Sequence, residues 1–151
     1  MRRLRPIALV LSLALLVPVV TGCGKGSLRH NQPAAATPAE VAVRATLTRL
    51  VTAVASRDYT LVCNQLLASN LTAQIAAVGL ACPAALAKGF GNVQSPALTV
   101  RSLHVNGTQA TAVVHATAAN QPSGDVTLGL TENAGHWQIS SLTSNLPQLQ
   151  G

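Results

Sequence analysis

The clearest structural pattern in the chain lies in residues 97–142, which read ALTVRSLHVNGTQATAVVHATAANQPSGDVTLGLTENAGHWQISSL. Apolar and polar residues alternate here with a period of two, the period of strands that have one face buried. Turn residues separate the alternating runs at Asn106-Gly107, Asn120–Gly124 and Asn133–Gly135. We therefore expect four antiparallel strands in chain order, over residues 97–105, 109–118, 126–130 and 136–142.

The first of these strands contains a change of phase. Leu98 and Val100 lie in one phase of the alternation, whereas Leu103 and Val105 lie in the other. One extra residue in a strand corrects such a shift, so the pattern predicts a β-bulge near residues 101–102.

Upstream of residue 91 the apolar residues recur with the period of a helix. Thr37-Pro38-Ala39-Glu40 has the pattern of a capping box with proline at the first helical position, which predicts a helix from Pro38 to near Ser56. Asp58 can cap a second helix, whose apolar face would consist of Tyr59, Val62, Cys63, Leu66 and Leu67. Residues 71–78 add a turn or two, and Cys82-Pro83 begins another short helix that ends at Gly89. Three helices followed by four strands predict an α+β fold.

The composition excludes several classes of protein. The 151 residues are 48% hydrophobic and 9% charged, which suits one small folded domain and excludes disordered and collagen-like chains. Three of the ten basic residues behind the net charge of +6 lie in the first five positions, and the other seven are spread thinly. With one Trp, one Tyr and one Phe, the chain also lacks an aromatic surface for stacking bases. We therefore expect no nucleic-acid partner.

The N-terminus has the pattern of an export signal. Residues 1–5 are basic, and the apolar run over residues 7–20 is too short for a membrane-spanning helix, which needs about 20 residues. The run ends in Val20-Thr21-Gly22-Cys23. This tetrapeptide resembles the bacterial lipobox, in which an aliphatic and two small residues precede a cysteine whose thiol receives a diacylglyceryl group. The resemblance predicts cleavage after Gly22 and an acylated Cys23; the alternative is an ordinary secretory signal, cut nearby, with a chance cysteine.

These patterns divide the chain into four segments. We expect a lipoprotein signal peptide over residues 1–22, the acylated cysteine and a flexible tether over 23–37, the α+β domain over 38–146 and a C-terminal tail over 147–151. A diacyl group on Cys23 supplies the two chains that stable membrane anchoring needs. The expected partner at this end is membrane lipid, and the expected location is the extracytoplasmic face of the cell membrane.

Two cysteines remain once Cys23 is acylated. Cys63 and Cys82 form an even pair in an exported chain, which predicts a disulfide. Two free buried thiols are the alternative. Neither a C-x-x-C nor an H-x-x-x-H spacing occurs in the sequence, so we expect no metal site and no other cofactor.

Together these elements resemble a known fold. A capped first helix, a second helix opening with Arg57-Asp58-Tyr59, antiparallel strands and a closing Gly135-His136-Trp137-Gln138-Ile139 strand look like the nuclear transport factor 2-like fold. In that family a curved sheet wraps around helices to form a cone with a pocket. Small extracytoplasmic members, many of them actinobacterial lipoproteins, carry this Gly-x-Trp-x-Ile/Val ending, so the resemblance implies such a lipoprotein. The chain departs from the family over the alanine-rich residues 69–82, where a strand is missing or degenerate, and another small α+β sandwich is the alternative fold.

The same resemblance raises the question of catalysis. Relatives of this fold include ketosteroid isomerases and polyketide cyclases, which need acid and base groups in a closed pocket. The domain has four carboxylates: Glu40 and Asp58 as helix caps, Asp125 at the start of a strand and Glu132 beside a turn. Tyr59 is expected to pack in the core with its hydroxyl on a surface partner. We therefore expect no catalytic residues, and an isomerase- or cyclase-like enzyme is the least favoured interpretation.

Two functions without catalysis remain. In the first, the concave face of the sheet, at positions such as Ala112, Val114 and Leu128, lines a small apolar pocket for a hydrophobic ligand. In the second, side chains fill the cone and the outer face of the sheet docks an envelope protein, which makes the domain an interaction or scaffold module. Small side chains on the strands favour the first function. We therefore expect a membrane-anchored lipoprotein that binds a small hydrophobic ligand.

Overall fold

Helices precede a four-stranded sheet in the computed structural model, which describes residues 35–144. The predicted signal peptide, Cys23 and the C-terminal tail lie outside the described residues. The helical elements are α1 (Pro38–Ser56), α2 (Tyr59–Leu61), the π-helix η1 (Val62–Leu66), α3 (Ser69–Ala77) and α4 (Cys82–Phe90). The strands are β1 (Gln94–Asn106), β2 (Gln109–Ala119), β3 (Gln121–Asn133) and β4 (His136–Ser144). The predicted α+β fold class is therefore confirmed.

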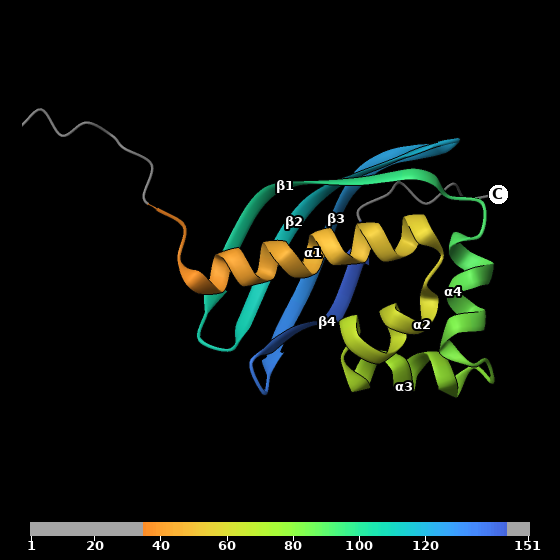
Figure 1. The fold of residues 1–151 in the computed structure, drawn as a ribbon, viewed down its shortest axis with the longest axis horizontal. Helices are drawn as coiled ribbons and strands as arrows, with labels where there is room; N and C mark the ends of the chain where they lie inside the picture. Colours follow the sequence, from red (N-terminus) through yellow and green to blue (C-terminus); the bar gives the residue numbers. More distant parts are fainter. Residues whose placement is uncertain (1–34, 145–151) are drawn as a thin grey trace, which may run out of the picture. The chain divides into compact units, whose positions relative to one another are not determined.

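The capping box at the start of α1 is present as predicted. Thr37 Oγ1 accepts a hydrogen bond from Glu40 N at 3.2 Å, and Glu40 Oε2 accepts one from Thr37 N at 2.7 Å. At the other end of the helix, Arg57 takes a left-handed conformation with a φ of 61°. In Figure 1, α1 lies across one face of the sheet. Val43 and Leu47 of α1 are buried in the same core cluster as residues of the strands.

The second helix takes a different form from the one expected. Asp58 caps it as predicted, since Leu61 N donates to Asp58 Oδ1 at 2.9 Å, but after three residues the α-helix continues as the π-helix η1. A π-helix has a wider turn, closed here by Leu67 N donating to Val62 O at 3.0 Å. The whole predicted apolar face is buried: Tyr59, Val62, Cys63, Leu66 and Leu67.

Two further helices, α3 and α4, complete the helical part. The segment expected to add a turn or two forms the nine-residue α3, so the described residues contain four α-helices where three were expected. α4 begins at Cys82 as predicted and ends at Phe90, one residue beyond the expected end. Asn70 Nδ2 donates to Ser140 O at 2.8 Å, which ties α3 to β4. In Figure 1, α2, α3 and α4 gather near the C-terminal end of α1.

The sheet is a simple meander in the order β1-β2-β3-β4, with every neighbouring pair antiparallel. Every strand pair contains a register shift, and the one at Val100/Ser102 in β1 is the bulge predicted near residues 101–102. Bulges bend a strand and increase its twist, so these irregularities curve the sheet. The four shifts lie at Gln94/Ala97, Val100/Ser102, Ala116/Ala118 and Gly129/Leu130.

Two of the three hairpin turns lie at or close to the predicted positions. In the first hairpin Asn106 pairs with Gln109, so the two-residue turn is residues 107–108 and the prediction is off by one residue. Gly107 has a φ of 56°, and glycine at the first turn position is typical of a type II′ hairpin. The predicted turn before β4 is confirmed as Ala134-Gly135, where both residues have positive φ.

The loop predicted over residues 120–124 is wrong, because β3 already begins there. Ala118 pairs with Gln121, which leaves the two-residue turn Ala119-Asn120. Among residues 35–144, β4 pairs with β3 only from Val126 onward. Pro122 has no partner across the register shift and loses no ladder hydrogen bond there, so it does not end the strand.

The core lies between α1, η1 and the helix-facing side of the sheet. Trp137 and Ile139 are buried on the same face of β4, as predicted. Thr46 Oγ1 donates to Trp137 O at 3.3 Å and joins α1 to β4 across 91 residues of sequence. The buried cluster comprises Val43, Leu47, Ala53, Val62, Leu66, Leu67, Ala110, Ala112, Val114, Leu128, Leu130, Trp137 and Ile139.

Candidate functional site

An apolar cavity of about 470 Å³ lies between the helices and the sheet. The C-terminal half of α1 forms one wall, and η1, α3 and α4 form a second. All four strands contribute to the third wall. The helical residues that line the cavity are Leu50, Val51, Val54, Val62, Leu71, Ile75, Leu86, Gly89 and Phe90.

The space exists because the helices at this end stand away from the sheet while the strands carry small side chains. α4 packs mainly on α2, α3 and η1, and α3 packs on β4. Facing them, β1 and β2 present Ala97, Ala116 and Ala118, which do not reach across the gap. The sequence therefore builds a hollow at one end of the core.

The cavity has a buried floor and an exposed rim. Val62, Leu67, Val114, Leu128 and Ile139 line the floor and are buried. At the rim, the side chains of Phe90 and Leu142 are 38% and 55% exposed, an unusual position for large apolar groups. Residues 121–122 at the start of β3 are also exposed rim residues.

The lining is almost free of polar groups. Among the described residues that line the cavity, only Thr117 and Gln121 have polar side chains, and none is ionisable. Such a surface can hold an apolar molecule, and it supplies two neutral groups for hydrogen bonds. It offers no acid or base for proton transfer.

The predicted ligand-binding residues do not all reach this cavity. Val114 and Leu128 line its floor. Ala112 is buried in the core but does not line the cavity, and we leave it out of the site. The sequence analysis missed the helical wall, although the apolar spacing of Leu71, Ile75 and their neighbours was visible in the sequence.

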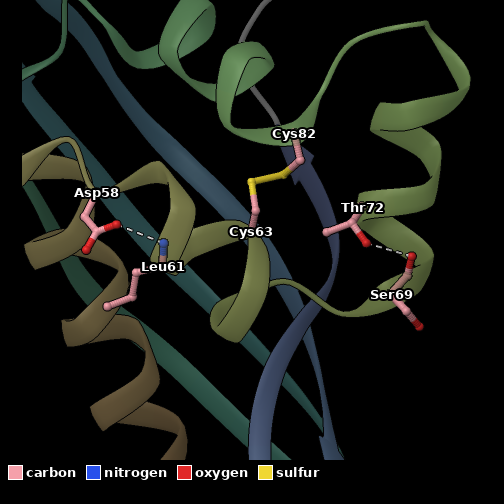
Figure 2. Close-up of a disulfide and its surroundings, with 6 residues drawn as sticks. All are labelled: Asp58, Leu61, Cys63, Ser69, Thr72 and Cys82. Carbon is pink, nitrogen blue, oxygen red and sulfur yellow. Dashed lines mark hydrogen bonds between the residues drawn. A yellow bond between two sulfur atoms is a disulfide. The ribbon is translucent and has the colours of Figure 1, made fainter.

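A disulfide supports the helical wall of the cavity. Cys63 in η1 is bonded to Cys82, the first residue of α4, as predicted (Figure 2). The two Cα atoms lie 6.0 Å apart, and 19 residues separate the cysteines in the sequence. Because α3 lies between them in the chain, the bond closes a loop around it. In Figure 2 the hydrogen bond from Thr72 Oγ1 to Ser69 O, 3.0 Å long, marks the first turn of α3.

The Tyr59 hydroxyl and the His115–Asp125 pair do not line the cavity. Tyr59 is 8% exposed, and its hydroxyl has no hydrogen-bond partner among the described residues, so the expected surface partner is absent there. His115 Nδ1 lies 2.7 Å from Asp125 Oδ1. This pair bridges β2 and β3 on the face opposite buried Val114, since successive strand residues point to opposite faces. Within residues 35–144 no three His, Cys, Asp or Glu residues are grouped as a metal site would require.

Comparison with known proteins bears on the fold. No family model and no curated protein matches the chain. Among solved structures, the chain is similar to a designed protein of the nuclear transport factor 2-like kind, with a TM-score of 0.50 and 13% sequence identity. The match covers 68% of this chain and 96% of the designed one. At this identity the likeness shows the fold alone, and the described domain has the nuclear transport factor 2-like α+β fold.

Proposed function

We propose that this protein is a bacterial lipoprotein that binds a small hydrophobic ligand at the cell envelope. In this proposal acylated Cys23 holds the chain on the extracytoplasmic face of the membrane, and the cavity holds the ligand without catalysis. The observation that carries the proposal is the apolar cavity of about 470 Å³.

The size and lining of the cavity support ligand binding. Its volume lies within the range of about 300–1,000 Å³ that is usual for small-molecule sites. Water is poorly held in a space lined by apolar groups, and an empty space deprives its walls of van der Waals contacts. An apolar ligand fills the space that water does not, and it restores van der Waals contacts to the walls.

The positions of the carboxylates support a role without acid–base catalysis. Glu40 and Asp58 bond to helix N-termini, and Asp125 pairs with His115 on the other face of the sheet. An isomerase or cyclase needs such groups at the ligand. The cavity lining described above includes none of them.

The membrane anchor is supported by the sequence. The basic residues, the apolar run and the Val20-Thr21-Gly22-Cys23 tetrapeptide occur in the order and at the distances that lipoprotein signals require. An intact, non-reduced mass spectrum of the protein from its native membrane tests this part. We expect a chain that begins at Cys23 and carries acyl groups. An unacylated chain cut elsewhere would overturn the anchor and leave the ligand-binding proposal standing.

Ligand binding is tested with a pair of matched variants. Ala116→Phe places a ring in the cavity, and Ala119→Phe places the same ring at an exposed position of the same strand outside the lining. Native mass spectrometry of the protein from its own membrane is expected to detect a bound small molecule in the wild type and in Ala119→Phe, and to find it lost in Ala116→Phe. Equal amounts of bound small molecule in the two variants would show that it binds outside the cavity. No bound molecule, together with a cross-linked envelope protein, would favour the interaction module instead.

A further inference from the structure

The corner formed by α3 and α4 has an unusually apolar exposed surface. We call residues 69–90 the α3–α4 corner. Val78, between the two helices, is 72% exposed, and Leu80 and Phe90 are also exposed. The corner also exposes the polar residues Ser69, Asn70 and Gln74 and six alanines: Ala73, Ala76, Ala77, Ala81, Ala84 and Ala87. Large apolar side chains rarely cluster on the surface of a domain without a partner to cover them.

The scarcity of charged residues in and near the α3–α4 corner indicates which kind of partner covers it. Lys88 is the single charged residue of the corner, and residues 59–124 contain no Asp or Glu. Exposed helices of a domain in water normally carry charged residues on their outer side. An apolar surface with one cation near its edge instead suits the interface of a lipid bilayer, where anionic headgroups lie beside the acyl chains.

The hydropathy of α3 and α4 agrees with a bilayer as the partner. Among the described residues no single helix is long and apolar enough to cross a membrane, but α3 and α4 taken together meet that threshold of length and composition, with a bend of 82° between them. Core helices of water-soluble proteins can be equally apolar because the protein buries them. Here neither helix contains a fully buried residue, although Leu71, Ile75 and Leu86 are partly buried against the core. The exposed apolar residues of the corner are the part that the core does not cover.

The corner is also continuous with the cavity. Leu71, Ile75 and Leu86 line the cavity from the inner side of the corner, and Phe90 is exposed at the cavity rim. Leu142 of β4 is the other large exposed apolar side chain of the rim. A surface that covered the corner would therefore extend to the opening of the cavity.

We propose that the α3–α4 corner lies in the interface of a lipid bilayer and that the cavity exchanges its ligand with that bilayer through the rim at Phe90 and Leu142. The exchange rests on the proposed ligand-binding function; the bilayer contact does not. The apolar ligand is then a resident of the membrane and does not have to cross water to reach the cavity.

The test places a tryptophan in the corner and asks whether lipid reaches it. In the full chain, Val78→Trp reports on the corner, Leu80→Trp is a second reporter there, and Val41→Trp on α1 is the control. Val41 is 56% exposed, and it lies closer in sequence to the proposed anchor. The variants are bound to vesicles of zwitterionic and anionic phospholipid, and the vesicle-bound fraction is isolated by flotation. The parent chain, which contains only Trp137, gives the background emission.

The expected result is an emission shift to shorter wavelength at positions 78 and 80 and quenching by lipids brominated near the headgroup. This quenching should exceed that at position 41 by about twofold or more, since a shallowly inserted helix lies within the headgroup–acyl boundary. Equal quenching at all three positions, or no bound fraction, would overturn the bilayer contact. Because no ligand is needed for this readout, quenching at position 78 without any molecule bound in the cavity would overturn the ligand-binding proposal alone.

Discussion

The stability that Glu40 contributes by capping α1 depends on pH. The hydrogen bonds from the Thr37 backbone and side chain hold the pKa of Glu40 below its ordinary value of 4.5, and Arg44 lowers it further. The folded state therefore favours the carboxylate. The contribution of the Glu40 carboxylate to stability is fully present at pH values above 4.5, and it is lost as the pH falls through the lowered pKa of the folded state.

Glu40→Gln should accordingly lower the thermal unfolding midpoint at neutral pH. Glutamine can still accept the bond from Thr37 N, so this variant removes mainly the charge. The difference between wild type and variant should shrink toward zero as the pH falls below 4.5 and through the lowered pKa of the wild-type carboxylate. Circular dichroism melts at neutral pH and at a series of acidic pH values measure this. A difference that is independent of pH would show that the charge is irrelevant to the cap.

Tyr59 leads to a second prediction at this scale. A buried hydroxyl without a partner costs roughly 1–3 kcal/mol, so removing it relieves the fold of that penalty. Tyr59→Phe should leave the free energy of unfolding unchanged or raise it by up to about 1 kcal/mol, as measured by urea denaturation. A loss of more than about 1 kcal/mol would mean that the hydroxyl has a partner in solution.

Single residues were predictable where the deciding interaction is local. The Thr37–Glu40 box and the Asp58 cap involve groups three residues apart, so the sequence shows both partners at once. The hydrogen bond between Thr46 and Trp137 joins groups 91 residues apart, and no local sequence pattern predicts it. The burial of Ala112 away from the cavity depends in the same way on how distant helices pack.

At the scale of elements, the disulfide contributes most to holding the helical wall in place. It closes a loop of about 20 residues that contains α3, and in the loop-entropy model such a closure stabilises a fold by about 3 kcal/mol. The variant with both Cys63→Ala and Cys82→Ala should lose about that amount of unfolding free energy in urea. Reductant should produce a similar loss in the wild type and none in the double variant. A loss below about 1 kcal/mol would show that packing alone holds α4.

The elements were predictable to different degrees for physical reasons. Strand order and the bulge near residues 101–102 follow from side-chain alternation, which each strand carries in its own sequence. Residues 120–124 contain turn-forming residues, yet Gln121 and Gly124 already pair with β2, a contact that their own sequence does not indicate. The three-residue α2 and its continuation as η1 depend on tertiary packing that helical periodicity does not encode.

At the scale of the whole molecule, the cavity couples ligand binding to stability. A ligand that binds only the folded state adds about 2.7 kcal/mol at a hundredfold excess over its dissociation constant. Returning the extracted small molecule to ligand-free protein should therefore raise the thermal midpoint by several degrees in the wild type and in Ala119→Phe. Ala116→Phe should not respond. Equal shifts in all three proteins would place the molecule outside the cavity.

The contact between Thr46 and Trp137 also has a kinetic consequence. Each strand pairs only with its neighbour in the chain, so the three hairpins can form from local segments. α1 must meet β4 across 91 residues, and closing so long a loop has a high entropic cost before any contact repays it. We therefore expect the contact between α1 and β4 to form after the hairpins during folding.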